Sequence, residues 1–338
     1  MNILIVRLGA LGDIVHAIPA AAALRAAFPS ARIDWLVDAR HREIVDLVTA
    51  IDRVVVLAKA SVGGWIAAAR DLRAGRYDAA LDFQGLMKSA VLARASGARR
   101  VLGFSIWHLR EKTARPFYSE SFDPSGSGAS PASHVIFKNL RLLEALGIRD
   151  APIAFPLRRV QSDASDRLLT EAGGAPFALL NPGAAWPNKQ WHSDRFGEVA
   201  AFLKEVRGLE PFVLWGPGEE PLARAVVEAS HGAARLAPLT RLQDLVEICR
   251  SASLMVSGDT GPLQIAAAVG TPIVSIFGPT DPERNGPWAP EDIVVSRFGS
   301  CGCHYDRRCR QAEWCLSTVP VVEVTAAAQQ RLGRKSER

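Results

Sequence analysis

Short runs of apolar residues, many of them β-branched, alternate along the chain with longer segments in which apolar positions recur at helical spacing. In the first half, the short runs predict strands at Ile3–Arg7, Ile33–Val37, Arg53–Leu57, Ala79–Phe83 and Val101–Gly103. The longer segments predict helices at Asp13–Ala27, Arg42–Ala50, Gly64–Ala74, Leu86–Ala95 and His134–Leu146. This alternation is typical of an α/β fold with a parallel sheet covered on both faces.

The second half repeats the same pattern without a close repeat of the sequence. Strands are predicted at Phe177–Asn181, Phe212–Trp215, Leu254–Ser257 and Ile273–Phe277. Helices are predicted at Ser193–Val206, Pro221–Ser230, Leu242–Ser251 and Pro262–Val269. Two sheets of this kind that face each other leave a cleft at the carboxyl ends of their strands, where ligands of open α/β sheets bind.

Two segments of different composition interrupt the pattern and suggest where the domains end. Ser119–Ser133 is rich in Ser, Gly and Pro and predicts a flexible surface loop, whereas Arg149–Pro156 predicts a linker stiffened by two prolines. We therefore expect one domain over residues 1–150 and a second over 157–320. A C-terminal helix and basic tail would follow over 321–338.

Length and composition agree with two folded domains. The chain has 338 residues, of which 48% are hydrophobic and 22% charged, as in globular proteins of two cores. No stretch reaches the roughly 18–20 uninterrupted apolar residues of a membrane helix. The opening run Asn2–Val6 has no basic region before it and leads to Gly and Asp, so it indicates a strand and not a signal peptide. We expect a cytoplasmic protein.

The net charge of the chain limits the classes of molecule that it could bind. The net charge of +5 comes from 40 basic and 35 acidic residues, an excess too small and too dispersed to indicate nucleic-acid binding. It suits an anionic small substrate, and it is compatible with peripheral contact with an acidic membrane surface.

The cysteines do not indicate a disulfide framework, because the chain is long and their number, 5, is odd. Four lie near the C-terminus, at Cys301, Cys303, Cys309 and Cys315. A zinc site is conceivable there, but the gaps are not those of a zinc finger. We predict reduced, partly buried thiols and no metal. Cys249 stands alone in a predicted helix and is expected in the core.

The first segment with candidate chemistry is Arg7–Asp13 (RLGALGD), which follows the first strand and opens the first helix. Its glycines allow a tight turn and a close approach to a ligand, although their spacing is not that of a dinucleotide-binding loop. Asp13 has two readings: a first-turn acid favoured by the helix dipole, or a general base for a hydroxyl group. His16, one turn later, could orient Asp13, but a packed helix histidine is the more frequent case.

The second segment, Asn181–Trp191, follows a strand and precedes a helix. A lysine held at the carboxyl end of a strand is a natural contact for a diphosphate, so Lys189 is a candidate. The alternative is an exposed loop lysine. After the next strand come Glu219 and Glu220, either of which could bind ribose hydroxyls or simply be a solvated acid at a helix start.

The third segment, Gly258–Gly261 (GDTG), is the strongest. It ends a buried strand, and Pro262 marks the first turn of the following helix. Free amides and the positive end of the helix dipole would make an anion site there. The alternative for Asp259 is that it simply caps the helix. The turn Gly278–Pro282 follows the next strand and could help to shape a sugar pocket.

These motifs together resemble glycosyltransferase family 9, the bacterial ADP-heptose:lipopolysaccharide heptosyltransferases. The resemblance rests on the G-x-x-G-D segment ending at Asp13, on Asp82–Ala90 (DFQGLMKSA), on the Lys189 loop and on Gly258–Pro262. They occur in consistent order from Asn2 to about Pro320. The second motif, with Leu109–Glu111 through Phe117 and Tyr118, looks most like the heptosyltransferase I branch, which adds the first heptose to Kdo of the inner core.

The resemblance implies a GT-B architecture of two Rossmann-like domains facing a cleft, with the acceptor bound by the first and the nucleotide sugar by the second. It implies inverting, metal-independent transfer from ADP-heptose to a lipid A–Kdo acceptor, with no further cofactor. Such an enzyme would work at the cytoplasmic face of the inner membrane.

The same resemblance assigns residues. Asp13 matches the catalytic base and Lys189 the lysine on the donor phosphate. The donor contacts it implies are Glu219, Thr240, Asp259, Thr260, Gly261 and Gln264, the last at a position where the family usually has His. The acceptor contacts it implies are Gln84, Lys88 and Arg110, where cations would meet Kdo carboxylates and lipid A phosphates.

Three alternatives remain. A nicotinamide-dependent oxidoreductase could use Asp38 at the end of the second strand, but the glycine spacing does not fit it. A non-catalytic nucleotide-sugar-binding module would share the Gly258–Gly261 loop and would not need Asp13. Within the family, heptosyltransferase II or another sugar specificity is the third. The sequence does not name the donor sugar, the acceptor position or the oligomeric state.

Overall fold

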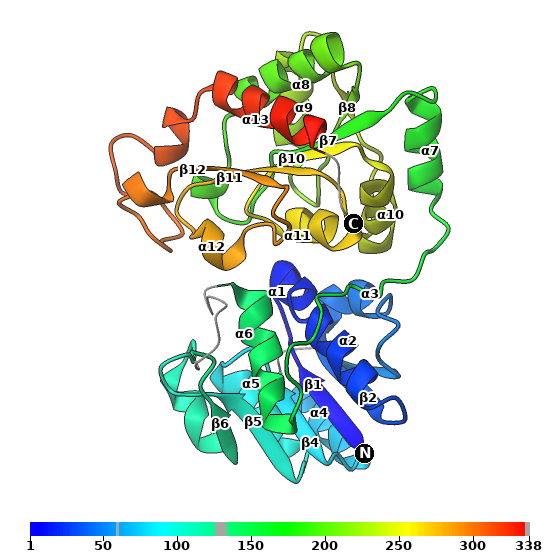
Figure 1. The fold of residues 1–338 in the computed structure, drawn as a ribbon, viewed down its shortest axis with the longest axis vertical. Coiled ribbons are helices and arrows are strands. Elements are labelled where there is room, and N and C mark those ends of the chain that lie inside the picture. Colours follow the sequence, from blue (N-terminus) through cyan, green and yellow to red (C-terminus); the bar gives the residue numbers. More distant parts are fainter. Residues whose placement is uncertain (59–60, 126–133, 335–338) are drawn as a thin grey trace. The chain divides into compact units, whose positions relative to one another are not determined.

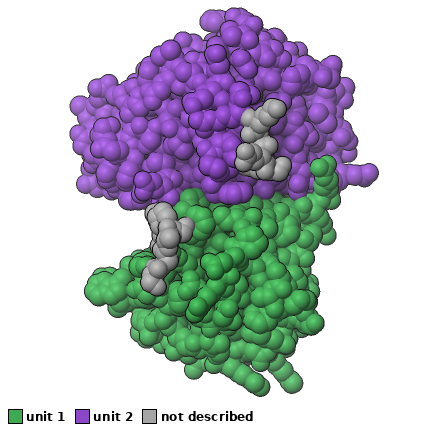
Figure 2. Space-filling model, in the orientation of Figure 1, with its two compact units in different colours: residues 1–159 green, residues 160–338 purple. Residues whose placement is uncertain are grey.

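A computed structural model gives the fold and describes residues 1–58, 61–125 and 134–334. The chain divides into two compact units, Met1–Arg159 and Val160–Arg338 (Figure 2). The segment Arg149–Pro156 therefore belongs to the first unit. Among the described residues, none of the helices is long and apolar enough to cross a membrane.

The first unit is built on a six-stranded parallel sheet of order β3-β2-β1-β4-β5-β6 (Figure 1). Its strands are β1 (Asn2–Val6), β2 (Arg32–Asp38), β3 (Arg53–Leu57), β4 (Ala79–Asp82), β5 (Arg100–Phe104) and β6 (Glu120–Phe122). The α-helices are α1 (Leu11–Val15), α2 (Ile18–Ala27), α3 (Arg42–Val45), α4 (Val62–Ala74), α5 (Met87–Ala95) and α6 (Val135–Leu142). Helices α4 and α5 share a core with the Leu4 and Val6 face of β1, and α2 packs against α6.

The second unit repeats this plan with a six-stranded parallel sheet of order β12-β11-β10-β7-β8-β9. Its strands are β7 (Phe177–Asn181), β8 (Glu210–Val213), β9 (Arg235–Leu236), β10 (Leu254–Gly258), β11 (Ile273–Phe277) and β12 (Ile293–Ser296). The helices are α7 (Asp163–Glu171), α8 (Ser193–Arg207), α9 (Glu220–Ala229), α10 (Leu242–Ser251), α11 (Gly261–Val269), α12 (Pro282–Asn285) and α13 (Val321–Gly333). Figure 1 shows α8, α9 and α13 on one face of this sheet and α10 and α11 on the other.

The central strands form because their apolar runs are buried on both faces, as a parallel sheet between two helix layers requires. Every residue from Ile3 to Val6 is fully buried, and so are Leu254, Met255 and Val256 of β10. Each central strand ends in a polar loop, since helices cover the faces and leave only the strand ends open to ligands. These loops carry the candidate site.

Two predicted helices are shorter than expected. The helix predicted over Asp13–Ala27 is divided into α1 and α2, because Pro19 occupies the first turn of α2 and proline cannot donate to a continuing helix. The helix predicted over Arg42–Ala50 ends at Val45. The backbone beyond it pairs elsewhere: Thr49 N donates to Pro156 O at 2.8 Å, and Val48 bridges Leu157.

The loop predicted over Ser119–Ser133 was wrong in its first part. Residues 120–122 form β6, which pairs with β5 and is fixed by an ion pair between Arg100 and Glu120 at 2.7 Å. Residues 126–133 of that prediction, and 335–338 of the predicted basic tail, lie outside the described residues. The strand predicted over Phe212–Trp215 lies two residues earlier in β8.

Candidate active site

In the second unit, Lys189 and Asp259 form an ion pair where β7 and β10 end. Lys189 Nζ lies 2.6 Å from Asp259 Oδ2, and the two side chains are only 14% and 11% exposed. The ammonium also lies 4.4 Å from the centre of the Trp186 ring, and Thr280 Oγ1 donates to the same carboxylate oxygen at 2.8 Å. The lysine is therefore held in place and is not a free surface side chain.

The close approach of the two loops depends on a glycine. Lys189 ends the 3₁₀ turn η4 (Pro187–Lys189), and a Cβ atom on Gly258 would lie 2.9 Å from the carbonyl oxygen of Lys189. A side chain at position 258 would push this turn away from β10. Asn188 fixes the turn from the other side, because its amide donates to Asp306 O at 2.8 Å.

Thr260 caps the helix that follows. Its Oγ1 accepts a hydrogen bond from Leu263 N at 3.4 Å, as an N-cap residue does, and receives another from the amide of Asn181 at 3.0 Å. Asn181 also donates to Ser257 Oγ at 3.0 Å. The nine-residue helix α11 thus begins beside Lys189, which combines a cation with the positive end of a helix dipole.

The cap gives a prediction for stability. Thr260→Val keeps the shape of the side chain but removes the cap, which contributes about 1 kcal/mol, and one of the hydrogen bonds of the buried Asn181 amide, which contributes about 0.5–1.5 kcal/mol. We expect the free energy of unfolding to fall by about 2 kcal/mol in a denaturant titration. Thr170→Val is the matched control, because that exposed hydroxyl bonds only within its own helix, to Asp166 O at 2.8 Å; an equal loss in both variants would contradict the capping role.

Gln264 lies on α11 one turn after the cap and is buried. Its amide nitrogen donates to Asn285 O at 2.6 Å, and Asn285 ends α12, the short helix after the turn Gly278–Pro282. The position predicted for a donor contact therefore ties α11 to this second loop.

Glu219 and Glu220 have different surroundings. The Glu219 carboxylate turns back over the loop and accepts a hydrogen bond from Gly216 N at 3.0 Å. A Cβ on Gly183 would lie 2.5 Å from that carboxylate, so the β7 loop passes directly beside it. Glu220 instead pairs with Arg224 on the outside of α9 at 2.6 Å. Of the two acids, Glu219 is the one that faces the other loops of the predicted donor site.

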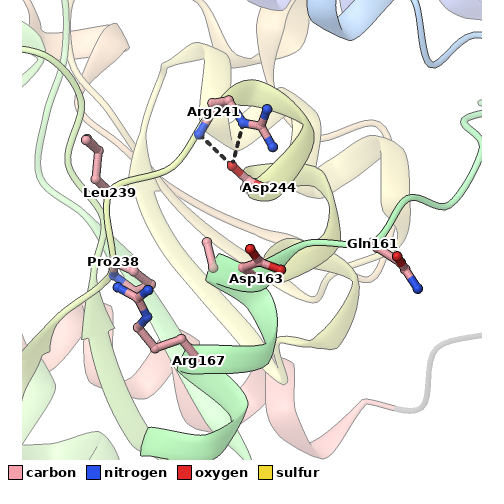
Figure 3. Close-up of a pocket in the computed structure, with 8 residues that line it drawn as sticks. Gln161, Asp163, Arg167, Pro238, Leu239, Arg241 and Asp244 are labelled. Carbon is pink, nitrogen blue, oxygen red and sulfur yellow. Dashed lines mark hydrogen bonds and ion pairs between the residues drawn. The ribbon is translucent and has the colours of Figure 1, made fainter.

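Thr240 lies in the loop between β9 and α10, and the residues on both sides of it line a pocket of about 280 Å³ (Figure 3). The lining is polar, with Arg167 from α7 and Arg241 and Asp244 at the start of α10. Asp244 Oδ2 accepts from the Arg241 backbone at 2.9 Å. The indole of Trp215 joins this loop to the end of β8 by donating to Ala237 O at 2.9 Å.

In the first unit, Asp13 is held by two arginines. Arg7 Nη2 lies 2.5 Å from Asp13 Oδ2, and Arg110 Nη1 lies 3.4 Å from the same oxygen. The Arg7 side chain is 4% exposed and that of Asp13 is 21% exposed, so the carboxylate stands at the edge of the unit on a buried cation. Burial lowers the pKa of the Arg7 guanidinium, and Asp13 opposes that shift.

The loop that carries Asp13 is fixed to the end of β4. Arg7 donates to Phe83 O, and the side-chain oxygen of Gln84 accepts from Leu8 N at 2.7 Å. Gln84 is in turn set by Asp82, which accepts from Gln84 N at 2.8 Å and from the Tyr118 hydroxyl at 2.7 Å. Burial raises the pKa of Asp82, and these hydrogen bonds oppose the shift. The buried Gln84, predicted to contact the acceptor, thus also holds the Asp13 loop.

Lys88 and His16 are the remaining candidate residues of the first unit. Lys88 is exposed on the first turn of α5. His16 is buried, with its ring 5.4 Å from that of His134, and its carbonyl accepts from Asn139 of α6 at 3.0 Å. These contacts support the packed-histidine reading.

The C-terminal cysteines come together. Cys303 Sγ lies 3.6 Å from Cys309 Sγ, and Cys315 has a side-chain hydrogen bond with Cys301. All five cysteines are free, and Cys249 is buried in α10 as predicted, where burial raises its pKa to about 12. Within the described part of the chain, no group of three or more His, Cys, Asp or Glu residues that could hold a metal was found.

Sequence reasoning missed the partners of the predicted residues. Arg7, Asn181 and Thr280 lay within candidate segments, but they were not predicted as the partners of Asp13, Thr260 and Asp259. The available signal was position, since each stands within three residues of the carboxyl end of a predicted central strand, where ligands of α/β sheets bind.

The structure has two Rossmann-like units. One carries a lysine beside a helix start and the other a carboxylate held by two arginines, an arrangement that suits an enzyme acting on an anionic substrate at the strand ends. The family model of glycosyltransferase family 9 (heptosyltransferase) matches residues 65–315, and the chain belongs to that family. The predicted class, a glycosyltransferase, is confirmed. The predicted nicotinamide-dependent and non-catalytic alternatives do not agree with it.

Relatives and solved structures agree with the family. Lipopolysaccharide heptosyltransferase 1 of Pseudomonas aeruginosa is 27% identical over 322 residues, which cover 91% of this chain and 87% of that protein. A glycosyltransferase family 9 structure from Veillonella parvula has a TM-score of 0.82 at 22% identity, covering 98% and 97% of the two chains. Escherichia coli heptosyltransferase WaaC, solved with ADP, has a TM-score of 0.78 at 24% identity, covering 98% and 100%. The predicted α/β GT-B architecture of two Rossmann-like domains is confirmed.

Proposed function

We propose that this enzyme transfers heptose, with inversion, from ADP-heptose to Kdo of the lipopolysaccharide inner core. The observation that carries the proposal is the pairing of Lys189 with Asp259 beside the start of α11 at 2.6 Å, in a chain of the heptosyltransferase family. The activity named for the Pseudomonas aeruginosa relative supports the acceptor, and the ADP with which the Escherichia coli enzyme was solved supports the nucleotide.

The second unit would bind the donor. Lys189 and the amides at Thr260 and Gly261 would stabilise the diphosphate as the bond between the anomeric carbon and the phosphate oxygen breaks. Glu219 would accept hydrogen bonds from the ribose, and Thr240 and Gln264 would line the adenine and sugar parts of the site. A cation and a helix dipole together supply the positive charge that the leaving ADP needs, so no metal is required in this proposal.

The first unit would bind the acceptor. Asp13 would take the proton of the acceptor hydroxyl as its oxygen forms the new bond to the anomeric carbon. The ion pairs with Arg7 and Arg110 would hold the Asp13 carboxylate in place, and Arg110 and Lys88 would meet the carboxylates and phosphates of the acceptor. Gln84 would position the Asp13 loop through Leu8.

The proposed acceptor also indicates where in the cell the enzyme works. A lipid A acceptor is anchored in a bilayer, so we propose that the enzyme works in the cytoplasm with peripheral contact to the inner membrane. Such contact is weakened by salt, since it depends on charges at the surface.

The decisive experiment incubates the full chain with ADP-heptose and Kdo-lipid A and follows the acceptor by mass spectrometry. We expect a gain of one heptosyl residue together with release of ADP. A second acceptor that already carries one heptose distinguishes the branches, because addition only to that acceptor would assign the chain to a later step such as that of heptosyltransferase II. No addition to either acceptor would reject the proposal.

Glu219 gives a prediction with a control beside it. Glu219→Gln should weaken ADP binding by about 10–100-fold in calorimetry, because hydrogen bonds to a charged group contribute about 1.5–3 kcal/mol. Glu220→Gln should leave the affinity unchanged, since that carboxylate pairs with Arg224 on the outside of α9. Equal effects of the two substitutions, or the reverse order, would exclude Glu219 from the ribose site.

A further inference from the structure

An exposed tryptophan, Trp107, stands in the first unit three residues before Arg110, which pairs with Asp13. Trp107 is 78% exposed, the adjacent Ile106 is 39% exposed, and Met87, at the start of α5, is 36% exposed. Tryptophan is highly buried on average, so a tryptophan this exposed beside a partly exposed isoleucine indicates a surface for interaction.

Basic side chains stand beside these apolar ones. Lys112 Nζ lies 5.5 Å from the centre of the Trp107 ring, and the backbone of Met87 donates to the Glu111 carboxylate at 2.7 Å. Trp107 is therefore near the Lys112 side chain, and the Met87 backbone is bonded to Glu111, the residue before Lys112. We call Met87, Lys88, Ile106, Trp107 and Lys112 the Trp107 surface.

Acidic groups near this surface are already engaged. The Glu111 carboxylate accepts the Met87 amide, and Asp123 lies 3.6 Å from the His108 ring. Lys88 and Lys112 are exposed and have no acid in direct contact among the ion pairs of the described residues. The surface thus combines an apolar centre with outward positive charge.

From these contacts we infer that the Trp107 surface docks the enzyme on a lipid bilayer that carries anionic head groups. Tryptophan concentrates at membrane–water interfaces because its ring is apolar and its N–H is polar, and lysines beside it are attracted by anionic lipid. Three exposed apolar side chains are too few for a stable protein interface, which buries about 800 Å² on each partner.

The position of the surface fits the proposed function, on which this inference rests. Arg110, which contacts Asp13 at 3.4 Å, follows Trp107 by three residues, a separation of at most about 11 Å even for an extended chain. A bilayer touched by Trp107 would present the sugars of a membrane-anchored acceptor within reach of Arg110 and Asp13. Docking would therefore deliver the acceptor as well as hold the enzyme.

The test measures sedimentation of the full chain with vesicles of phosphatidylcholine alone or mixed with phosphatidylglycerol. We expect binding to the anionic vesicles that falls with salt, and weaker binding to the neutral ones. Trp107→Ala should lower the partition coefficient by about ten-fold, from the apolar area of one indole. Lys112→Gln should lower it by about five-fold, as expected for one basic residue at an anionic surface.

Matched controls come from exposed positions of the second unit. Val322→Ala removes an apolar side chain that is 71% exposed, and Arg207→Gln removes an exposed cation at the end of α8; neither should change the partition coefficient. No vesicle binding by the wild-type chain, or equal binding by Trp107→Ala, would overturn the inference, and so would equal losses in the control variants.

A second readout separates this inference from the proposed function. With a deacylated, water-soluble Kdo acceptor and no vesicles, Trp107→Ala should transfer heptose at the wild-type rate, and its thermal unfolding should be unchanged because the ring is exposed. Loss of that activity in Trp107→Ala would make the residue part of the catalytic unit and overturn a docking role. Failure of the wild-type chain to transfer would reject the function while the vesicle result still decides the docking.

Discussion

Replacing Asp13 with Asn is expected to lower the rate of heptosyl transfer by about 10²–10⁴-fold, the usual contribution of a general base. Asn keeps the size of the side chain and can still accept hydrogen bonds from Arg7 and Arg110, but it cannot take up the acceptor proton. ADP binding should be unaffected, because the proposed donor contacts belong to the second unit. The transfer rate is measured as release of ADP in the presence of ADP-heptose and Kdo-lipid A. The affinity for ADP is measured separately by calorimetry.

A control acid and a stability measurement make this result interpretable. Asp46→Asn removes another acid of the first unit, which pairs with Arg42 at 3.0 Å on the surface, and it should transfer at the wild-type rate. The Asp13 variant also weakens the partner of a buried arginine, and breaking a buried pair can cost about 3–5 kcal/mol. Circular dichroism must therefore show that the variant is folded at the assay temperature. A folded Asp13→Asn with a rate within a few-fold of wild type would remove Asp13 from the role of base.

The central strands could be predicted from sequence because burial on both faces leaves a continuous apolar run. Of the four strands at the sheet edges, β3 was predicted and the other three could not be. β6, β9 and β12 have two to four residues each, and several of these residues are partly exposed. A short edge strand has one neighbour and one side open to solvent, so its composition does not differ from that of a loop.

The candidate site divides in the same way. The loop Gly258–Gly261 could be predicted as an anion site from its own residues, because a strand end, a threonine cap and a helix start are local features. Asp13 could not be assigned this way, and its proposed role came from the family resemblance. Its two arginines stand 6 positions before it and 97 positions after it along the chain, the latter a separation that only the folded sheet brings together.

The Lys189–Asp259 pair shows a further limit. The two residues are 70 positions apart. From its local sequence, Lys189 could be an exposed loop lysine and Asp259 a helix cap. Only the parallel pairing of β7 with β10 places their loops side by side, and only Gly258 allows the final approach. Which strands pair is a property of the sheet topology, and it cannot be predicted from the spacing of residues within one segment.

Lys189→Met is expected to lower the turnover number by about 10²–10³-fold, comparable to the loss of one preorganised group that stabilises developing charge, and to weaken ADP binding. Met keeps the length and apolar stem, including the contact with Trp186. Lys204→Met is the matched control, since that lysine pairs with Glu210 at 3.3 Å at the amino end of β8, and its kinetics should be those of wild type.

The pairing with Asp259 allows a sharper test. In Lys189→Met the Asp259 carboxylate remains, largely buried and without its cation, and it would repel the donor diphosphate. Adding Asp259→Asn removes that repulsion, so the double variant should bind ADP more tightly than Lys189→Met alone. Its turnover should stay low, because neither variant restores a cation to the leaving group. If the double variant recovered the rate as well, Lys189 would act only by neutralising Asp259, and the charge on the departing ADP would have to be stabilised elsewhere.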